Sequence, residues 1–289
     1  MINVLITGGN GQLATSIKDI ERDYCKLNLI YTDYSELDIT DLNQVNQFFE
    51  EYKPIHYCVN CAAYTAVDKA EEESELAFKI NAEGPKNLAM ACLENKTKLI
   101  QISTDFVFDG EKTEPYTELD EPNPISVYGA SKLQGEKEVQ NFLKEYFIIR
   151  TSWLYSEHGH NFMKTMLRLA ETKDEIRVVS DQIGTPTYAG DLAKVILDIV
   201  KNNSKEFGVY HFSNEDESSW YDFAKAIFEM SDKYIKIHPI MTEAYPSAAK
   251  RPRYSVLDLT KTNQQLQPFN DGWEGRLEAA IKALNKDAI

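Results

Sequence analysis

The chain has 289 residues, of which 43% are hydrophobic and 27% are charged, as is usual for a globular protein with a buried core. Its net charge of −15, from 31 basic and 46 acidic side chains, disfavours nucleic acid and anionic membranes as partners. No apolar run approaches the ~20 residues of a membrane-spanning helix, and Met1–Ile6 lacks the basic start of a signal peptide. We therefore expect a cytoplasmic protein with reduced cysteines, no nucleic-acid partner and no membrane partner.

Short apolar runs alternate with helical patterns through the first half of the chain. The runs are partly β-branched or aromatic and apolar at successive positions, which is typical of strands buried on both faces. They cover residues 2–7, 27–32, 56–61, 98–103 and 146–151. Apolar stripes with helical spacing lie between them, including one at residues 45–52. The alternation predicts a Rossmann-type, doubly wound parallel sheet of the α/β class.

After about residue 152 this alternation loosens. Apolar stripes mark further helices near residues 192–200, 220–227 and 277–284, and Asp191 is a candidate N-cap for the helix that follows it. Single strands and Pro-containing loops separate these helices. We expect a smaller, discontinuous α/β domain beside the sheet domain. The predicted bounds are 1–154 and 188–213 for the sheet domain, and 155–187 and 214–289 for the smaller one.

A glycine-rich turn, GGNGQLA at residues 8–14, joins the first predicted strand to a helical stripe. Gly8 permits a sharp turn, and Gly11 lets a pyrophosphate approach the backbone at the positive end of the helix. A turn without a ligand is the alternative, but strand, glycine turn and helix in this order favour an NAD(P)-type dinucleotide. The predicted contacts in this turn are Gly8, Asn10, Gly11, Gln12 and Leu13.

An acidic residue, Asp33, follows the second predicted strand about twenty residues after the glycines. A carboxylate there accepts a hydrogen bond from the ribose 2′-hydroxyl of the cofactor and repels a 2′-phosphate. Glu36 and Asp38 crowd the same segment, so a merely acidic loop is the alternative. We predict NADH as the preferred cofactor, with NADPH as the alternative.

Tyr128 and Lys132 form a Tyr-x-x-x-Lys pair at the start of a predicted helix. The spacing places both side chains on one helical face, where the ammonium stabilises a phenolate and lowers the pKa of the tyrosine. Thr104 comes directly after a predicted strand, at the edge where a parallel sheet binds ligands, and can hydrogen-bond a carbonyl group. We predict Thr104, Tyr128 and Lys132 as catalytic residues for chemistry at a carbonyl.

With these motifs the sequence resembles the extended short-chain dehydrogenase/reductase family and, within it, the dTDP-4-dehydrorhamnose reductases. The similar blocks lie at residues 62–71, 103–110, 150–155, 181–187 and 251–258. The sequence departs from the pattern at Phe106, where relatives usually have tyrosine, and at Ala14, where glycine is commoner. We interpret Phe106 as a packing residue.

The resemblance implies that the sheet domain binds NAD(P) and that the smaller domain binds the sugar nucleotide. It implies reduction of the 4-keto group of dTDP-4-dehydro-6-deoxy-L-mannose to dTDP-L-rhamnose, with Tyr128 as proton donor. Lys132 would tune Tyr128 and hold the nicotinamide ribose, and Thr104 would orient the carbonyl. Further cofactor contacts would come from Asp33, Asp38, Ile39, Ala62, Ala63, Tyr64, Tyr128 and Lys132. Substrate contacts would come from Thr65, Val67, Thr104, Asp105, Trp153 and Arg251.

Two other functions stay open at this point. A sugar-nucleotide epimerase or dehydratase would keep the fold, although Phe106 stands where a dehydratase would complete a carboxylate pair with Asp105. A non-catalytic regulatory subunit, similar to that of methionine adenosyltransferase, would not need the intact catalytic residues. His158 and His160 show no third ligand in the sequence, so we predict no metal. We expect a monomer or a homodimer.

Overall fold

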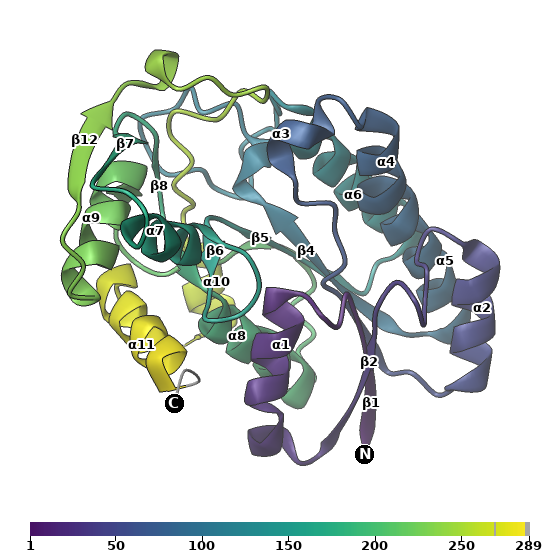
Figure 1. The fold of residues 1–289 in the computed structure, drawn as a ribbon. Helices are drawn as coiled ribbons and strands as arrows, with labels where there is room; N and C mark the ends of the chain where they lie inside the picture. The colour runs from purple at the N-terminus through teal and green to yellow at the C-terminus, as the bar shows by residue number, and fades with distance from the viewer. Residues whose placement is uncertain (269, 287–289) are drawn as a thin grey trace.

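A six-stranded parallel sheet forms the centre of the computed structural model, which describes residues 1–268 and 270–286 (Figure 1). The strand order is β10-β5-β4-β3-β1-β2. The strands are β1 Ile2–Thr7, β2 Leu27–Thr32, β3 Tyr57–Asn60, β4 Lys98–Thr104, β5 Tyr146–Thr151 and β10 Gly208–His211. The predicted doubly wound α/β fold is confirmed, and β1, β2 and β5 have the predicted bounds.

Helices cover both faces of the sheet, because successive side chains along each strand point to opposite faces. These helices are α1 Gln12–Asp19, α2 Leu42–Glu51, α5 Gly84–Asn95, α6 Val127–Phe142 and α8 Ala189–Lys201. Helices α1 and α8 pack against the face that carries Val4 and Ile6. Helices α2, α5 and α6 pack against the opposite face, which carries Leu5.

Later elements form a second hydrophobic core at one side of the sheet, in teal, green and yellow in Figure 1. The longer ones are α7 Phe162–Ala170, β7 Glu175–Val179, α9 Trp220–Met230, β12 Lys236–Ile240 and α11 Trp273–Lys286. Tyr155, Phe223 and Leu277 lie at the centre of this core. An ion pair between Arg276 of α11 and Asp191 of α8 connects it to the helices on the sheet.

Asp191 is not the N-cap of α8, so that prediction was wrong. The helix begins one turn earlier, after Tyr188, and the Asp191 carboxylate is buried within the first turn. It accepts hydrogen bonds from Arg276 and Asn214, contacts between distant segments that the local sequence does not reveal.

Short elements connect these larger ones. The strands among them are β6 Leu154–Tyr155, β8 Ile183–Gly184, β9 Thr187–Tyr188 and β11 Ser218–Ser219. The helices and turns are η1 Glu21–Tyr24, α3 Val67–Ala70, α4 Ser74–Phe78, the π-helical η2 Lys79–Glu83, η3 Asp105–Val107, η4 Thr242–Ala244 and α10 Thr260–Gln265. Among the described helices, none is long and apolar enough to span a membrane.

The strand order changes direction at β1. From β1 the chain runs outward to β2 and then returns to β3 on the other side of β1. The loops that follow β1 and β3 therefore diverge, and in an open parallel sheet this divergence creates a crevice at the carboxyl ends of the strands. The glycine turn follows β1 at this edge, and Thr104 is the last residue of β4.

Candidate active site

The glycine turn after β1 adopts a conformation that requires glycine. Gly8 has a φ of +65°, and a Cβ atom at this position would lie 2.8 Å from the backbone of Ala62. The N–H of Gly9 donates to the carbonyl of Thr32 at 2.8 Å, and that of Gly11 donates to the carbonyl of Gly8 at 2.9 Å. No side chain caps α1. The N–H groups of its first turn are therefore available to an anion.

A cavity of about 420 Å³ opens beside this turn, within the usual size range of a ligand site. Among the residues predicted to bind the cofactor, those that line it are Gly8, Gly11, Asp33, Asp38, Ile39, Ala62 and Ala63. The other lining residues were not predicted: Tyr34, Leu37, Thr40, Cys61, Leu76, Lys79 and Ile80. The last three come from α4 and η2. Both elements are short, and the apolar pattern gave no signal for them.

Asp33 lies at the edge of the cavity with its carboxylate oriented by the backbone. It accepts hydrogen bonds from the N–H of Asn10 at 2.8 Å and from the N–H of Tyr34 at 2.7 Å. Asp38 also lines the cavity, but its carboxylate accepts from the N–H and hydroxyl of Thr40. Both carboxylates therefore line the cavity with their orientation fixed by local hydrogen bonds.

The remaining residues of the glycine turn that were predicted to bind the cofactor do not line the cavity. Leu13 packs in the hydrophobic core, and the Gln12 amide donates to the carbonyl of Leu154 at 3.2 Å. Asn10 is exposed, and its N–H is bonded to Asp33. For Gln12 and Leu13, the backbone is the part of the residue free to meet a ligand.

Tyr64 is also turned away, because its hydroxyl donates to Glu73 at 2.5 Å. Its backbone is held by Asn81, a buried residue that the sequence analysis missed. The Asn81 side chain accepts from the N–H of Tyr64 at 2.8 Å and donates to its carbonyl at 3.0 Å. It also donates to the hydroxyl of Ser131 in α6 at 3.0 Å. Asn81 thus connects the cofactor-side loop to the helix that carries Tyr128.

The predicted catalytic residues come together where β4 meets α6. The hydroxyl of Ser126 caps α6 by accepting from the N–H of Gly129 at 3.2 Å, which places Tyr128 in the first turn. Lys132 lies one turn further, and its ammonium donates to the carbonyl of Ile102 in β4 at 2.7 Å. Thr104 ends that strand, and its hydroxyl lies beside the phenol of Tyr128.

Burial sets the protonation of these groups. It raises the pKa of Tyr128 to about 12, although the Thr104 hydroxyl beside it acts in the opposite direction. Burial likewise lowers the pKa of Lys132 to about 8, while the carboxylate of Glu136 raises it. The sequence analysis expected Lys132 to lower the pKa of Tyr128. The pKa is raised because desolvation of the phenolate outweighs every other contribution.

Asp105 and Phe106 follow Thr104 directly. Asp105 is buried, which raises the pKa of its carboxyl to about 6. Its Oδ1 accepts from the Thr104 hydroxyl at 3.0 Å, and its Oδ2 has no hydrogen-bond partner within 3.5 Å in the described part of the chain. Phe106 packs edge-on against the Tyr128 ring, with centroids 5.6 Å apart, in agreement with its interpretation as a packing residue.

The residues predicted to bind substrate lie in two groups. Thr65 is exposed and Val67 half-buried, and Arg251 reaches the same region. The guanidinium of Arg251 pairs with Asp68, the neighbour of Val67, through contacts of 2.6 and 3.1 Å. Part of the hydrogen-bonding capacity of the Arg251 guanidinium is therefore taken up by Asp68. Trp153 follows β5.

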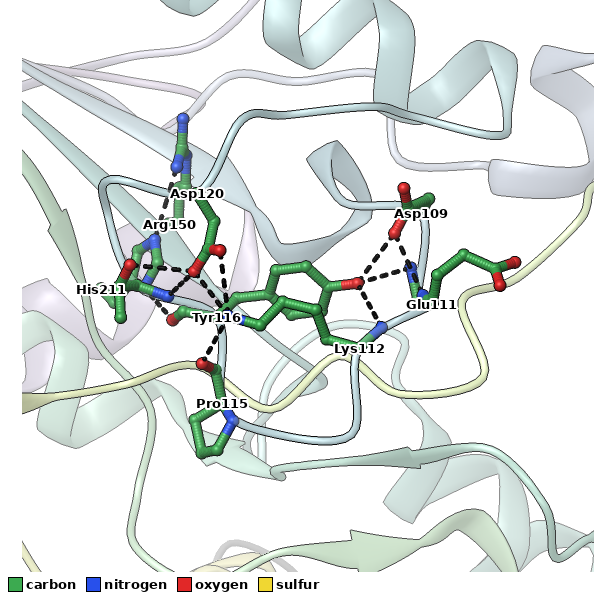
Figure 2. A network of polar contacts seen from close by, with 10 residues as sticks. Asp109, Glu111, Lys112, Pro115, Tyr116, Asp120, Arg150 and His211 are labelled. Carbon is green, nitrogen blue, oxygen red and sulfur yellow. Dashed lines mark hydrogen bonds and ion pairs between the residues drawn. The ribbon is translucent and has the colours of Figure 1, made fainter.

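Figure 2 shows a polar network next to the catalytic strand that the sequence analysis did not identify. The hydroxyl of Tyr116 donates to Asp109 at 2.8 Å, and its carbonyl lies 3.0 Å from Nδ1 of His211. Arg150 lies 3.4 Å from Nε2 of His211 and forms a buried ion pair with Glu136 of α6 at 2.7 Å. The network connects four parts of the chain: the loop that follows β4, strands β5 and β10, and helix α6.

His158 has acidic neighbours that the sequence did not reveal. Its Nε2 lies 2.6 Å from Asp19, and one potential ligand atom from each of Asp19, Glu157 and His158 lies within 4.8 Å of the others. Glu157 also accepts from the hydroxyl of Tyr188 at 3.1 Å. The Oε2 atom of Glu157 is buried without a hydrogen-bond partner in the described part of the chain. The absence of a required metal stays a prediction.

Comparisons with known proteins agree on one family. A family model described as the RmlD substrate binding domain matches residues 2–286. The dTDP-4-dehydrorhamnose reductase of Aggregatibacter actinomycetemcomitans is 41% identical, over 96% of this chain and 98% of its own. The crystal structure of such a reductase from Clostridium acetobutylicum is 46% identical with a TM-score of 0.94, and covers 98% of this chain and 100% of its own.

A Bacillus anthracis dTDP-4-dehydrorhamnose reductase, solved in complex with NADP, is 42% identical with a TM-score of 0.93. That match covers 98% of this chain and 100% of the Bacillus chain. The family model, the curated relative and the solved structures all indicate the same family. The chain belongs to the RmlD substrate binding domain family, that of the dTDP-4-dehydrorhamnose reductases, and is an NAD(P)H-dependent oxidoreductase.

Proposed function

We propose that this chain reduces the 4-keto group of dTDP-4-dehydro-6-deoxy-L-mannose to give dTDP-L-rhamnose, with Tyr128 as the proton donor. The observation that carries the proposal is the convergence of Thr104, Tyr128 and Lys132 at the carboxyl edge of the sheet. The glycine-lined cavity opens at the same edge. Family membership supports the reaction class and the sugar-nucleotide substrate.

The glycine turn presents backbone rather than side chains to the cavity, as the pyrophosphate of a dinucleotide requires. When bound, the nicotinamide supplies the hydride for the reduction. We propose NADH as the preferred form. The oriented carboxylate of Asp33 would accept a hydrogen bond from the ribose 2′-hydroxyl of NADH, and it would repel the 2′-phosphate of NADPH. The NADP complex of the Bacillus anthracis relative makes NADPH the alternative.

The chain's own groups move one proton. The Thr104 hydroxyl orients the substrate carbonyl beside the phenol of Tyr128. The raised pKa of Tyr128 keeps that phenol protonated at neutral pH until negative charge develops on the carbonyl oxygen. The Lys132 ammonium, held by the carbonyl of Ile102, then stabilises the phenolate that remains.

We propose residues 1–154 and 188–213 as the cofactor domain and residues 155–187 and 214–289 as the sugar-nucleotide domain. The separate hydrophobic cores support this division, since α8 and Tyr210 pack with the sheet whereas α9 and α11 pack together elsewhere. In this arrangement Arg251 contacts the sugar nucleotide from the smaller domain. The contacts from the sheet domain are Thr65, Val67, Thr104, Asp105 and Trp153.

The test is oxidation of NADH with dTDP-4-dehydro-6-deoxy-L-mannose, measured by the loss of nicotinamide absorbance. Tyr128→Phe removes only the hydroxyl and is expected to lower kcat by roughly 100- to 10,000-fold. Tyr234→Phe, at a 98% exposed tyrosine, is the matched control and should behave as wild type. No turnover by the wild type, or full activity of Tyr128→Phe, would contradict the proposal.

A further inference from the structure

Trp153 has a backbone conformation that large side chains rarely adopt. Its φ of +44° lies in the left-handed region, where a bulky residue is strained. The neighbouring main chain is fixed on both sides. The hydroxyl of Ser152 donates to the carbonyl of Thr185 at 2.7 Å, and the carbonyl of Trp153 accepts from the N–H of Thr187 at 3.2 Å. Such strain persists only where the surroundings hold the residue in place.

The indole of Trp153 lies flat on the indole of Trp220, with centroids 3.5 Å apart and planes 8° from parallel. Trp220 is the first residue of α9, whose N-cap Ser219 accepts from the N–H of Asp222 at 3.0 Å. Phe162 packs against Trp220 at 4.6 Å. Trp220 is thus anchored in the second hydrophobic core and presents its ring to Trp153.

Gly184 lies against the same indole. A Cβ atom at Gly184 would lie 2.6 Å from Cε2 and 2.7 Å from Nε1 of Trp153, so no side chain fits there. Strand β8, which contains Gly184, pairs with Ser218 and Ser219 of β11, directly before Trp220. One short sheet therefore fixes both groups that contact the Trp153 ring.

We propose that Trp220 and Gly184 are positioning residues that hold Trp153 in its strained conformation as a wall of the sugar-nucleotide pocket. The inference rests on the proposed function, in which Trp153 contacts the substrate. Trp220 acts through Trp153 and is not part of the proton-transfer set. Its loss therefore affects recognition of the sugar nucleotide rather than the chemical step.

The stack can be tested first without any substrate. Two indoles in close contact give an exciton couplet from their strong absorption band in far-ultraviolet circular dichroism. The chain has 3 tryptophans, and Trp273 contacts Phe223 instead of Trp153. Trp220→Phe should abolish the couplet, whereas Trp273→Phe, the same substitution in the same core, should retain it. A couplet that survives Trp220→Phe would overturn the proposal.

Kinetics then test the positioning. Trp220→Leu is expected to raise KM for the dTDP-sugar about three- to tenfold, the equivalent of a lost aromatic contact, with kcat and KM for NADH near wild type. Gly184→Ala, which displaces Trp153 directly, should raise the same KM. Trp220→Phe should partly restore it, and Trp273→Phe should not change it.

The outcomes separate the two proposals. Wild-type turnover with an unchanged KM in both Trp220→Leu and Gly184→Ala would overturn the positioning role alone. A parallel fall of kcat with all KM values unchanged would also overturn it. No wild-type turnover would overturn the proposed function, and the inference with it. Thermal unfolding of each variant identifies any fall in apparent kcat that reflects unfolded protein.

Discussion

Burial acts in opposite directions on the two titratable residues of the proposed proton-transfer set. Charged forms lose hydration in the interior, so the pKa of Tyr128 rises to about 12 and that of Lys132 falls to about 8. A neutral phenol is the form that a reduction needs. Glu136, one turn beyond Lys132, favours the ammonium and so offsets part of the effect of burial. The residue pair was predictable from spacing, but its protonation depends on the depth at which β4 and α6 pack.

Asp33 permits a test of cofactor choice. Asp33→Ser removes the negative charge at the edge of the cavity, and the ratio of kcat/KM for NADPH to that for NADH should rise roughly tenfold, because a 2′-phosphate is no longer repelled. Steady-state kinetics with both cofactors measure the ratio. Asp23→Ser, at an exposed acid outside the cavity, is the control. An unchanged ratio in Asp33→Ser would refute the role assigned to this carboxylate.

At the scale of elements, the strands of the sheet and the longer helices that pack on it could be predicted from the sequence. Strands β1, β2 and β5 carry continuous apolar runs, and α2 carries a stripe with helical spacing. The segments α3, α4 and η2 were not predicted. They are too short for a periodic signal, and distant contacts hold them in place, such as the bond from Asn81 to Ser131. The cavity is lined partly by α4 and η2, so its full outline could not be derived from periodicity.

Asn81 tests whether η2 holds the cofactor loop. Asn81→Ala leaves the buried N–H and carbonyl of Tyr64 without their partner, which should lower the free energy of unfolding by about 2 kcal/mol. It should also raise the Kd for NADH, since the loop after β3 loses its anchor. Urea unfolding and fluorescence titration measure the two effects. Asn95→Ala removes an amide bonded only to the carbonyl of Ala91 in its own helix, and should leave the Kd unchanged. An unchanged Kd in Asn81→Ala would refute the anchor.

At the scale of the whole molecule, the site depends on pairs from distant parts of the chain. Trp153 stacks on Trp220, and Arg150 pairs with Glu136 next to His211. Sequence blocks predicted Thr104 and Trp153, and local spacing predicted Tyr128 and Lys132, because each pattern lies within one stretch of chain. They could not locate Trp220 or Glu136, since neither belongs to a local motif and each acts through a partner that only the fold brings close.

His211 links this distant packing to the pH dependence of stability. Burial, and secondarily Arg150, lowers its pKa to about 3 in the folded chain. Its neutral ring donates from Nδ1 to the carbonyl of Tyr116 (Figure 2). The unfolded chain binds a proton at His211 below about pH 6.5, and the folded chain does not until about pH 3. The contribution of His211 to stability is therefore complete above pH 6.5 and declines as the pH falls.

Between pH 6.5 and pH 3, protonation of His211 in the unfolded chain should lower the free energy of unfolding by about 1.4 kcal/mol for each unit that the pH falls. His211→Gln keeps an amide donor for the carbonyl of Tyr116 and has no titratable group. Between pH 7 and pH 5 it should lose about 2 kcal/mol less than the wild type in urea unfolding, whatever its stability at pH 7. His160→Gln, at an exposed histidine, should follow the wild type. If the slopes of His211→Gln and wild type coincide, His211 is not the buried neutral group that makes this fold sensitive to acid.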